Sequence, residues 1–332
     1  MRKRMGGFLK PRKWTEISFL PALMMMVLFF IINCIITKNF LSFSYLISLV
    51  GNNAPLILIS LGVAVVILGG GIDIAQGSLI TVLNVIFVTL AAVQGMDFRA
   101  AAVLIIMMGM AVGAINGIII SVFKVPALLA TFSMTFVLDG LSYWIMPMPQ
   151  GGMPGELVAW YHSKFLSVPM PVIILFITVF LWILIKKSPI GTWILAFGNH
   201  SGSAYVSGVP VHFTQIFTYM FAGLLGGIAA FAMTSNTGSG DALLAQGMSL
   251  QAVAACVIGG LSLNGGRGSL AGAFMGAVFL FLTSTMVYSL KVNIIYQDLI
   301  EAVIILVGVI GSVLINRAMA QIKTKREGEL NG

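Results

Sequence analysis

Long runs of apolar residues, separated by short polar or glycine-rich segments, constrain this chain more than any other feature. Crossing the hydrocarbon core of a bilayer as a helix takes about 20 apolar residues. The eighth run, residues 249–262, has only fourteen, so we expect it to be extended by its flanks or to be a broken or re-entrant helix. The predicted spans are 15–37, 53–71, 76–94, 101–123, 126–146, 169–187, 213–234, 249–262, 269–290 and 296–316.

The low content of charged residues indicates that these runs lie in lipid rather than in water. Charged residues make up 8% of the chain and hydrophobic residues 59%, whereas soluble domains carry roughly 25% charged residues. In lipid, a helix satisfies its own backbone groups, and few charges are needed. The chain is therefore predicted to be an all-α integral membrane protein, a polytopic bundle of about ten transmembrane helices in the cell inner membrane.

The basic residues indicate how the bundle is oriented. With the N-terminus inside, the cytoplasmic segments hold fourteen of the eighteen Lys and Arg residues and the outside segments hold four, and cytoplasmic ends are enriched in such residues. Both termini are then cytoplasmic. We predict a basic N-terminus at 1–14, a transmembrane domain at 15–316 and a cytoplasmic tail at 317–332. The net charge of +8 does not indicate nucleic-acid binding, which needs a basic face on a folded domain.

Three glycines and one carboxylate interrupt the second and third runs at residues 68–78. Glycine permits a sharp turn or an unwound backbone, and Asp73 can cap the helix that follows. One interpretation is an ordinary tight turn with an N-cap. The other is a broken helix whose polar backbone lines a transport path, with Gly70, Gly71, Asp73 and Gln76 as the path or helix-break residues.

A second glycine-rich motif, GGLSLNGGRGS, occupies residues 259–269. It lacks the Lys that a phosphate-binding loop requires after its second glycine, and it joins two apolar runs rather than a strand and a helix. We interpret it as a glycine-lined helix break with Arg267 at the cytoplasmic face. Broken or short helices are thus predicted near 69–78 and 249–268, and any ATP hydrolysis is expected on a separate polypeptide.

Several polar residues fall within the predicted spans. Intramembrane charges usually face a cavity or pair internally, so Asp139 is a candidate path residue, whereas Glu301 lies where the interface could solvate it. Asn116 and Gln251 are further path candidates, for which hydrogen bonding between helices is the alternative. The sequence contains no catalytic triad, no Cys–His pair and no metal-ligand spacing. An enzymatic activity, a metal and a cofactor are therefore not expected.

Four motifs together resemble one family, the ribose/xylose/arabinose-type ABC importer permeases. This family also includes permeases for galactosides, autoinducer-2 and nucleosides. The resemblance extends from about residue 45 to residue 316, and the motifs occur in the order and spacing of the family. They are GGGIDIAQGSLI, KVPALLATFSMTFVLDGLSYW, FGNHSGSAYVSGVPV and VIGGLSLNGGRGSLAGAFMGA.

The resemblance implies a transport subunit that moves a small polar solute, of monosaccharide size, across the membrane. Its implied partners are a double-domain ABC ATPase, an extracytoplasmic solute-binding protein that is periplasmic or lipid-anchored, and a second copy of the chain or a homologous permease. A nucleoside or an autoinducer-2-like solute is the alternative cargo. The resemblance leaves the choice between homodimer and heterodimer open.

The resemblance also implies roles for particular loops. The inside loop at 188–212 resembles the coupling loop that docks on the ATPase. The outside loops at 147–168 and 235–248 are candidate docking surfaces for the binding protein. The coupling residues are Gly198, Asn199, Ala204, Ser207 and Gly208, and the docking candidates are Glu156, Trp160, Tyr161 and Asp241.

The chain departs from the family pattern at three polar sites. Asp139 precedes Gly140 where these permeases commonly read Arg-Gly, Gln251 replaces an acidic residue, and Glu301 replaces a basic one. These changes fit a divergent substrate branch or one half of a heterodimer. From another class, a self-contained channel or ion-coupled carrier would use Asp73, Asp139 and Glu301 and would need no ATPase. An exporter subunit is disfavoured only by the resemblance.

Overall fold

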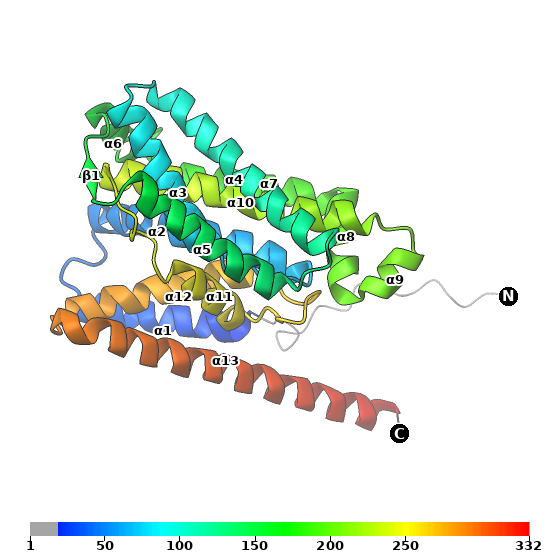
Figure 1. Ribbon diagram of the computed structural model, residues 1–332. Coiled ribbons are helices and arrows are strands. Elements are labelled where there is room, and N and C mark those ends of the chain that lie inside the picture. The colour runs from blue at the N-terminus through cyan, green and yellow to red at the C-terminus, as the bar shows by residue number, and fades with distance from the viewer. Residues whose placement is uncertain (1–18, 332) are drawn as a thin grey trace.

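The computed structural model describes residues 19–331, which form a bundle of helices with two short two-stranded sheets (Figure 1). The N-terminus predicted at 1–14 and the first four residues of the predicted first span lie outside the described residues. The helices are α1 (Leu20–Ile36), α2 (Phe43–Leu68), α3 (Gln76–Val88) continued by a π-helical turn η2 (Thr89–Val93), α4 (Phe98–Ser121), α5 (Ala127–Ile145), α6 (Gly155–Tyr161), α7 (Met170–Lys187), α8 (Pro189–Asn199), α9 (Ser201–Val206), α10 (Val211–Thr237), α11 (Met248–Ile258), α12 (Leu270–Ser289) and α13 (Ile294–Asn331).

The prediction of a polytopic helical membrane protein is confirmed. Within residues 19–331, eight helices are long and apolar enough to cross a membrane, and the shorter apolar helices α1 and α11 account for the two remaining predicted runs. The helix α2 begins ten residues before the predicted span, because the hydroxyl of Ser42 accepts the N–H of Tyr45 and caps it there. The helix α13 continues to Asn331, through most of the tail predicted at 317–332.

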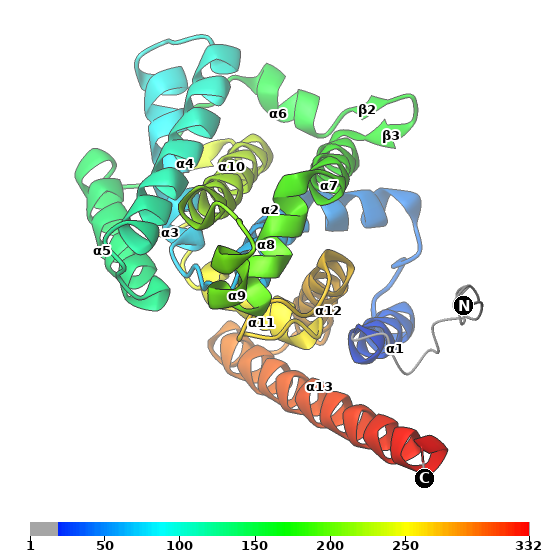
Figure 2. The same cartoon turned by 90° about the vertical axis from the view of Figure 1, so that its right-hand side faces the viewer.

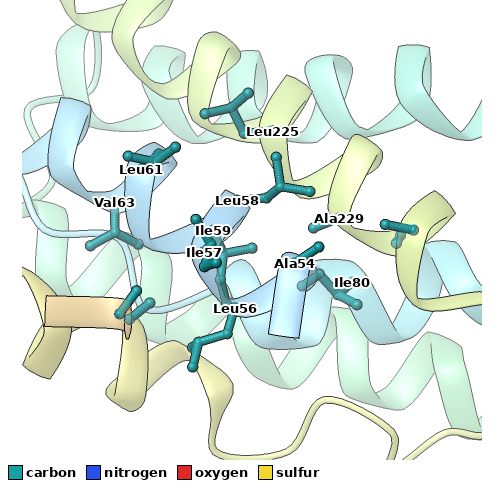
Figure 3. Close-up of a cluster of buried hydrophobic side chains, with 14 of the residues drawn as sticks. Ala54, Leu56, Ile57, Leu58, Ile59, Leu61, Val63, Ile80, Leu225 and Ala229 are labelled. Carbon is teal, nitrogen blue, oxygen red and sulfur yellow. The ribbon is translucent and has the colours of Figure 1, made fainter. Parts of the chain in front are cut away.

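The core of the bundle is built around α2. Every residue from Ala54 to Leu68 is buried, and α10, α11, α12 and α7 pack against this helix. In an end-on view α2 lies near the centre and α13 at the periphery (Figure 2). The buried side chains of α2 lie beside Leu225 and Ala229 of α10 and Ile80 of α3 (Figure 3). Because lipid is as apolar as these side chains, close packing stabilises this core.

The most extensive contact between two described helices, that of α4 with α10, is lined by glycines. On α4 these are Gly109, Gly113 and Gly117, at every fourth position; Gly109 faces Gly223 and Gly227 of α10, and the other two face the backbone of α10 one and two turns earlier. A Cβ atom added at Gly109 would lie 2.5 Å from the carbonyl oxygen of Gly223. Glycines at this spacing let two helix backbones approach, so the glycines of α10 form a helix-packing surface.

The connections between helices gather at two ends of the bundle. The helices α8 and α9 lie at one end, whereas α6 and strand β1 lie at the other (Figure 1). Strand β1 (Gln150–Gly151) pairs antiparallel with β4 (Ser239–Gly240), and β2 (Lys164–Phe165) pairs with β3 (Val168–Pro169). We refer to these ends as the inner end, which holds α8 and α9, and the outer end.

Candidate functional site

The connection between α2 and α3 is a helix break at the inner end. The helix α2 ends at Leu68, and α3 begins only at Gln76. Gly70 has a φ of +75°, in the left-handed region that glycine adopts without steric cost. The N–H groups of Gly70 and Gly71 still bond to α2, to the carbonyl oxygens of Ile67 and Val66. The remaining residues of the break are free of regular structure.

Asp73 organises the second half of this break. Its carboxylate is buried, with Oδ1 accepting the N–H of Ala75 at 3.0 Å and Oδ2 accepting the side-chain amide of Gln76 at 2.6 Å. The carboxylate therefore fixes the turn that leads into α3. The N–H of Ile74 donates to the hydroxyl of Thr131 on α5 at 3.4 Å, which ties the same turn to a neighbouring helix. Asp73 thus holds a turn in an unwound segment between two spans, but it does not cap α3 as expected, because the N-cap of α3 is Ala75, which has no side-chain hydrogen bond.

A cavity of about 370 Å³ opens beside the break, and we call it the central cavity. Its walls come from the end of the break, from α3, α5 and α11, and from the segment that precedes α11. Its lining is mixed, with several hydroxyl groups, one carboxylate and two phenylalanines. The polar lining residues are Ser78, Thr81, Thr135, Asp139, Tyr143, Gln246 and Ser249.

The predicted path residues divide between this cavity and the protein core. Asp139 lines the central cavity and is half-buried. Gln76 and Asn116 are buried outside it, and each has a side-chain oxygen without a hydrogen-bond partner among the described residues. Gln251 is half-buried on α11 and does not line the cavity either. Glu301 accepts a hydrogen bond from Ser284 of α12, away from the cavity.

Ser249 is a cavity residue that sequence reasoning missed. Its hydroxyl accepts the N–H of Gly77 at 2.7 Å and so joins the start of α11 to the start of α3. Gln251, two positions later, was the predicted residue in this segment, where it replaces an acidic residue of the family pattern. The signal that would have found Ser249 is its place at the beginning of a helix too short to span the membrane, where a half-helix end faces the membrane interior.

Three glycine motifs far apart in the sequence meet at one point, which we call the glycine junction. It consists of Gly70 in the break, Gly198 at the end of α8, and Gly265 with Gly266 in the connection between α11 and α12. The carbonyl oxygen of Leu68 accepts the N–H of Gly266 at 3.1 Å. A Cβ atom at Gly265 would lie 2.6 Å from the carbonyl oxygen of Gly198 and 2.7 Å from the Cα of Gly70. Only backbone fits between these three segments.

The predicted coupling residues lie on α8, α9 and the turn after them. Gly198 and Ala204 are buried, whereas Asn199, Ser207 and Gly208 are exposed. Gly208 has a φ of +80°, and a Cβ atom placed there would meet nothing within 4 Å. The neighbouring side chains of Tyr205 and Val206 are 74% and 86% exposed. This segment thus presents small and apolar groups to its surroundings while its first glycine is packed against the break.

The two loops predicted to dock the binding protein lie together at the outer end. The β1–β4 pairing joins the loop at 147–168 to the loop at 235–248. Glu156 is exposed and Trp160 is 38% exposed, and Asp241 is half-buried, with its backbone N–H donating to Asn84. Tyr161 differs from these residues, because its side chain is fully buried and its hydroxyl donates to the carbonyl oxygen of Gly51 at 2.8 Å. Burial also raises the pKa of Tyr161, which stays protonated and structural.

Known proteins resemble this chain over most of its length. Residues 45–309 match a protein family described as the permease component of the branched-chain amino acid transport system. The ribose import permease protein RbsC of Escherichia coli K12 is 29% identical over 282 residues, which cover 83% of this chain and 87% of the relative. RbsC of Bacillus subtilis is 30% identical over 294 residues, covering 87% and 91%. A probable ABC transporter permease of Sinorhizobium fredii is 31% identical over 261 residues, covering 77% and 78%. No solved structure matches the chain.

Proposed function

Because the chain belongs to the permease component family of the branched-chain amino acid transport system, we propose that it imports a ribose-like monosaccharide as the membrane subunit of an ATP-driven transporter. The membership predicted from four motifs is confirmed by the family match and by the ribose import permeases among its relatives. The chain is a multi-pass membrane permease of an ABC importer and not a catalytic subunit. The choice of cargo and the roles of individual residues are the proposal.

The central cavity carries the proposal. Its volume of about 370 Å³ falls in the range of small-molecule sites, roughly 300–1,000 Å³. Hydroxyl groups such as that of Thr135 both donate and accept hydrogen bonds, and the carboxylate of Asp139 accepts them. A sugar offers several hydroxyl donors to such a lining. The phenylalanines of α5, Phe132 and Phe136, lie in the same wall and would contact the apolar faces of the ring.

The glycine junction supports a path from the ATPase to this cavity. The segment of α8 and α9 lies at the inner end, and Gly198 packs on the break at Leu68 and Gly70. The opposite end of the break, at Ile74, lines the central cavity. A shift of α8 driven by ATP binding would therefore move backbone atoms that border the cavity. Backbone packed on backbone transmits such a shift without the slack of flexible side chains.

The partners follow from the same arrangement. An ABC ATPase and a solute-binding protein are the partners of an importer permease of this family. We propose that the ATPase is a double-length chain that docks on α8 and α9, with a second copy of this chain or a homologous permease completing the membrane core. The binding protein is proposed to dock at the outer end, on the surface that includes Glu156, Trp160 and Asp241.

Transport by the reconstituted system tests the cargo. The chain is combined with its ATPase and binding protein in proteoliposomes, and ATP-dependent uptake of labelled ribose is measured with a nucleoside and autoinducer-2 as competitors. Asp139→Asn is expected to lower ribose uptake by roughly tenfold, because it replaces a charged hydrogen-bond acceptor worth about 1.5–3 kcal/mol. Competition by the nucleoside alone would reassign the cargo. Solute flux through the chain without the ATPase would instead support the channel or ion-coupled carrier.

A bulky residue at Gly208 tests the coupling segment. A Cβ atom at Gly208 meets nothing within 4 Å, although its φ of +80° strains any residue with a side chain. Gly208→Trp should leave membrane insertion intact and abolish uptake by obstructing the ATPase. A combined replacement of Ala204, Ser207 and Gly208 is expected to give the same result. Gly95→Trp is the matched control, because Gly95 also has a left-handed backbone, with φ of +70°, and open space around it, but lies between η2 and α4. Uptake that survives Gly208→Trp would show that this segment does not dock the ATPase.

A further inference from the structure

A cavity of about 480 Å³ lies at the outer end of the molecule, and we call it the outer cavity. It is formed where α1 and α12 end and where α2 and α13 begin. In both views α1 and α13 lie on one side of the bundle and α6 lies on the other (Figure 1, Figure 2). The proposed import path uses the central cavity and the glycine junction, so it does not explain the groups that line the outer cavity.

Two of the four basic residues in the outside segments line this cavity. Arg99 and Lys164 do not, because each lies over a phenylalanine ring, 5.5 and 4.9 Å from the ring centroid. Lys38 follows α1 and Lys291 follows α12, and both line the outer cavity. Within the described part of the chain, neither of these two lysines lies over a ring. Since Lys and Arg are scarce on the outside, two of them in one cavity indicate a local use for positive charge.

The outer cavity carries a net positive charge. Lys38 and Lys291 are both exposed, and no Asp or Glu among the described residues lines the cavity with them. Two helices end here and two begin, so the partial charges of the four helix ends oppose one another. The full charges of the two lysine side chains remain. The cavity therefore favours an anion.

Polar uncharged groups complete the lining. The hydroxyl of Thr37 donates to that of Ser289 at 2.8 Å, which leaves the hydrogen of Ser289 for another acceptor. The amide of Gln297 donates to the carbonyl oxygen of Val292 at 2.9 Å, and its second hydrogen and its oxygen remain for a ligand. The phenol of Tyr45 lines the same space. These groups suit a ligand that carries hydroxyl groups beside its negative charge.

Exposed aliphatic side chains adjoin the cavity on two peripheral helices. On α1, Ile35 is 80% exposed and directly precedes the lining residue Ile36. On α13, Ile295 and Leu299 are exposed on either side of the lining residue Gln297. An anion site at the end of two apolar helix faces fits the headgroup and the acyl chains of one phospholipid molecule.

We propose that the outer cavity binds the headgroup of phosphatidylglycerol. Lys38 and Lys291 hold the phosphate, Ser289, Tyr45 and Gln297 contact the glycerol hydroxyls, and the acyl chains lie along α1 and α13. A zwitterionic phospholipid fits less well, because no carboxylate in the lining meets its ammonium group. Both α1 and α13 pack against α12. The bound lipid therefore holds these two peripheral helices against α12 and stabilises the protein.

Lipid titration of the purified full-length chain tests this inference without any transport. The chain is kept in detergent, and binding is measured by native mass spectrometry with phosphatidylglycerol, phosphatidylcholine and inorganic phosphate as separate probes. Phosphatidylglycerol is expected to bind more tightly than phosphatidylcholine and to raise the temperature of unfolding. Lys38→Gln and Lys291→Gln should each weaken its binding by roughly fivefold, the effect of about 1 kcal/mol for one lysine near a membrane surface.

The matched control for Lys291→Gln is Lys124→Gln. Both lysines are exposed and have a left-handed backbone, with φ of +54° and +56°, but Lys124 lies between α4 and α5. Lys124→Gln should bind phosphatidylglycerol like the unmodified chain, and Lys291→Arg, which keeps the charge, should do the same. Equal affinity of the unmodified chain and the double variant Lys38→Gln/Lys291→Gln would overturn the proposal.

Two other occupants of the outer cavity would give different results. If inorganic phosphate binds through Lys38 and Lys291 and phosphatidylglycerol does not, the site takes a soluble anion and the proposal is wrong. The solute-binding protein is the second alternative, and its affinity for the double variant is measured in the same detergent. If that affinity falls while phosphatidylglycerol binds as before, the two lysines belong to the docking surface and the lipid site is rejected.

Discussion

Glycine brings backbones together in two regions of this molecule, and the two regions differ in kind. Between α4 and α10, glycines such as Gly109 and Gly223 lie inside regular helices and let two spans approach. At the glycine junction, Gly70, Gly198 and Gly265 lie where helices end, and two of them have positive φ. The first region is a continuous interface, whereas the second joins three chain breaks at one point.

This difference predicts different roles for the two regions. The interface between α4 and α10 stabilises the protein, whereas the glycine junction transmits movement of α8 to the helix break. Two intact helices that pack over several turns form a rigid pair, because each keeps all its backbone hydrogen bonds. A junction of helix ends can change its local φ and ψ without breaking a span, which is what hinges require. We therefore expect substitutions between α4 and α10 to lower thermal stability, and substitutions at the glycine junction to lower uptake more than stability.

Among substitutions in these two regions, the largest effect on uptake is expected for Gly198→Ala. The added Cβ atom would overlap the carbonyl oxygen of Leu68 and lie 2.9 Å from the backbone nitrogen of Gly266, and neither is a flexible side-chain atom. The end of α8 must then separate from the break, and uptake should fall by at least about tenfold, the effect of 1.4 kcal/mol on the coupling step. ATP-dependent uptake and detergent-extracted yield are measured in parallel. Normal uptake would show that the contact between α8 and the break is not used in transport.

Gly109→Ala should act mainly on stability. Its Cβ atom would lie 2.5 Å from the carbonyl oxygen of Gly223 and 3.2 Å from Gly227, so α4 and α10 must move apart. Overpacking of this kind costs roughly 1–3 kcal/mol. Thermal unfolding in detergent should begin at a lower temperature, while the uptake per folded molecule stays within about twofold. A variant with normal stability and lost uptake would assign this interface to transmission and erase the contrast between the two regions.

Gly70→Ala is predicted to have a smaller effect than Gly198→Ala, although both residues belong to the glycine junction. A Cβ atom at Gly70 would lie 3.4 Å from the Cα of Gly198, which is an ordinary contact, so the remaining cost is that of a left-handed backbone. That cost is roughly 1–2 kcal/mol for a residue with a Cβ atom. Uptake should fall by a few-fold, and Gly70→Asn, which tolerates this conformation better, should recover part of it. Failure of Gly70→Asn to recover uptake would favour a steric role.

The smallest effect is expected for Gly140→Ala on α5. A Cβ atom there meets nothing within 4 Å, and alanine is favoured over glycine in a helix by about 1 kcal/mol. Uptake and thermal stability should match or slightly exceed those of the unmodified chain. Because Gly140 follows Asp139, a strong loss of uptake would instead indicate that this part of α5 contacts the solute or a partner protein.

Local properties of the sequence determined the class, the spans and the family. Apolar length predicts a membrane helix because each span satisfies its own backbone within about 20 residues, and within residues 19–331 each of the predicted runs contains a helix. The glycine motifs also predicted breaks, because glycine interrupts a helix wherever the chain folds. The start of α2 was missed by ten residues, since the polar residues Asn52 and Asn53 resemble a boundary although they lie inside the helix.

The tertiary structure alone decided which of these features act together. No local pattern links Gly70, Gly198 and Gly265, which lie far apart in the sequence and meet only when three chain segments converge. Likewise, only the structure shows that the side chain of Tyr161 is buried while that of its neighbour Trp160 is exposed. Residue type, length and charge are fixed along the chain, so they can be read from it. Proximity and burial depend on how the helices pack, and that packing placed Asp139 in the central cavity beside the break.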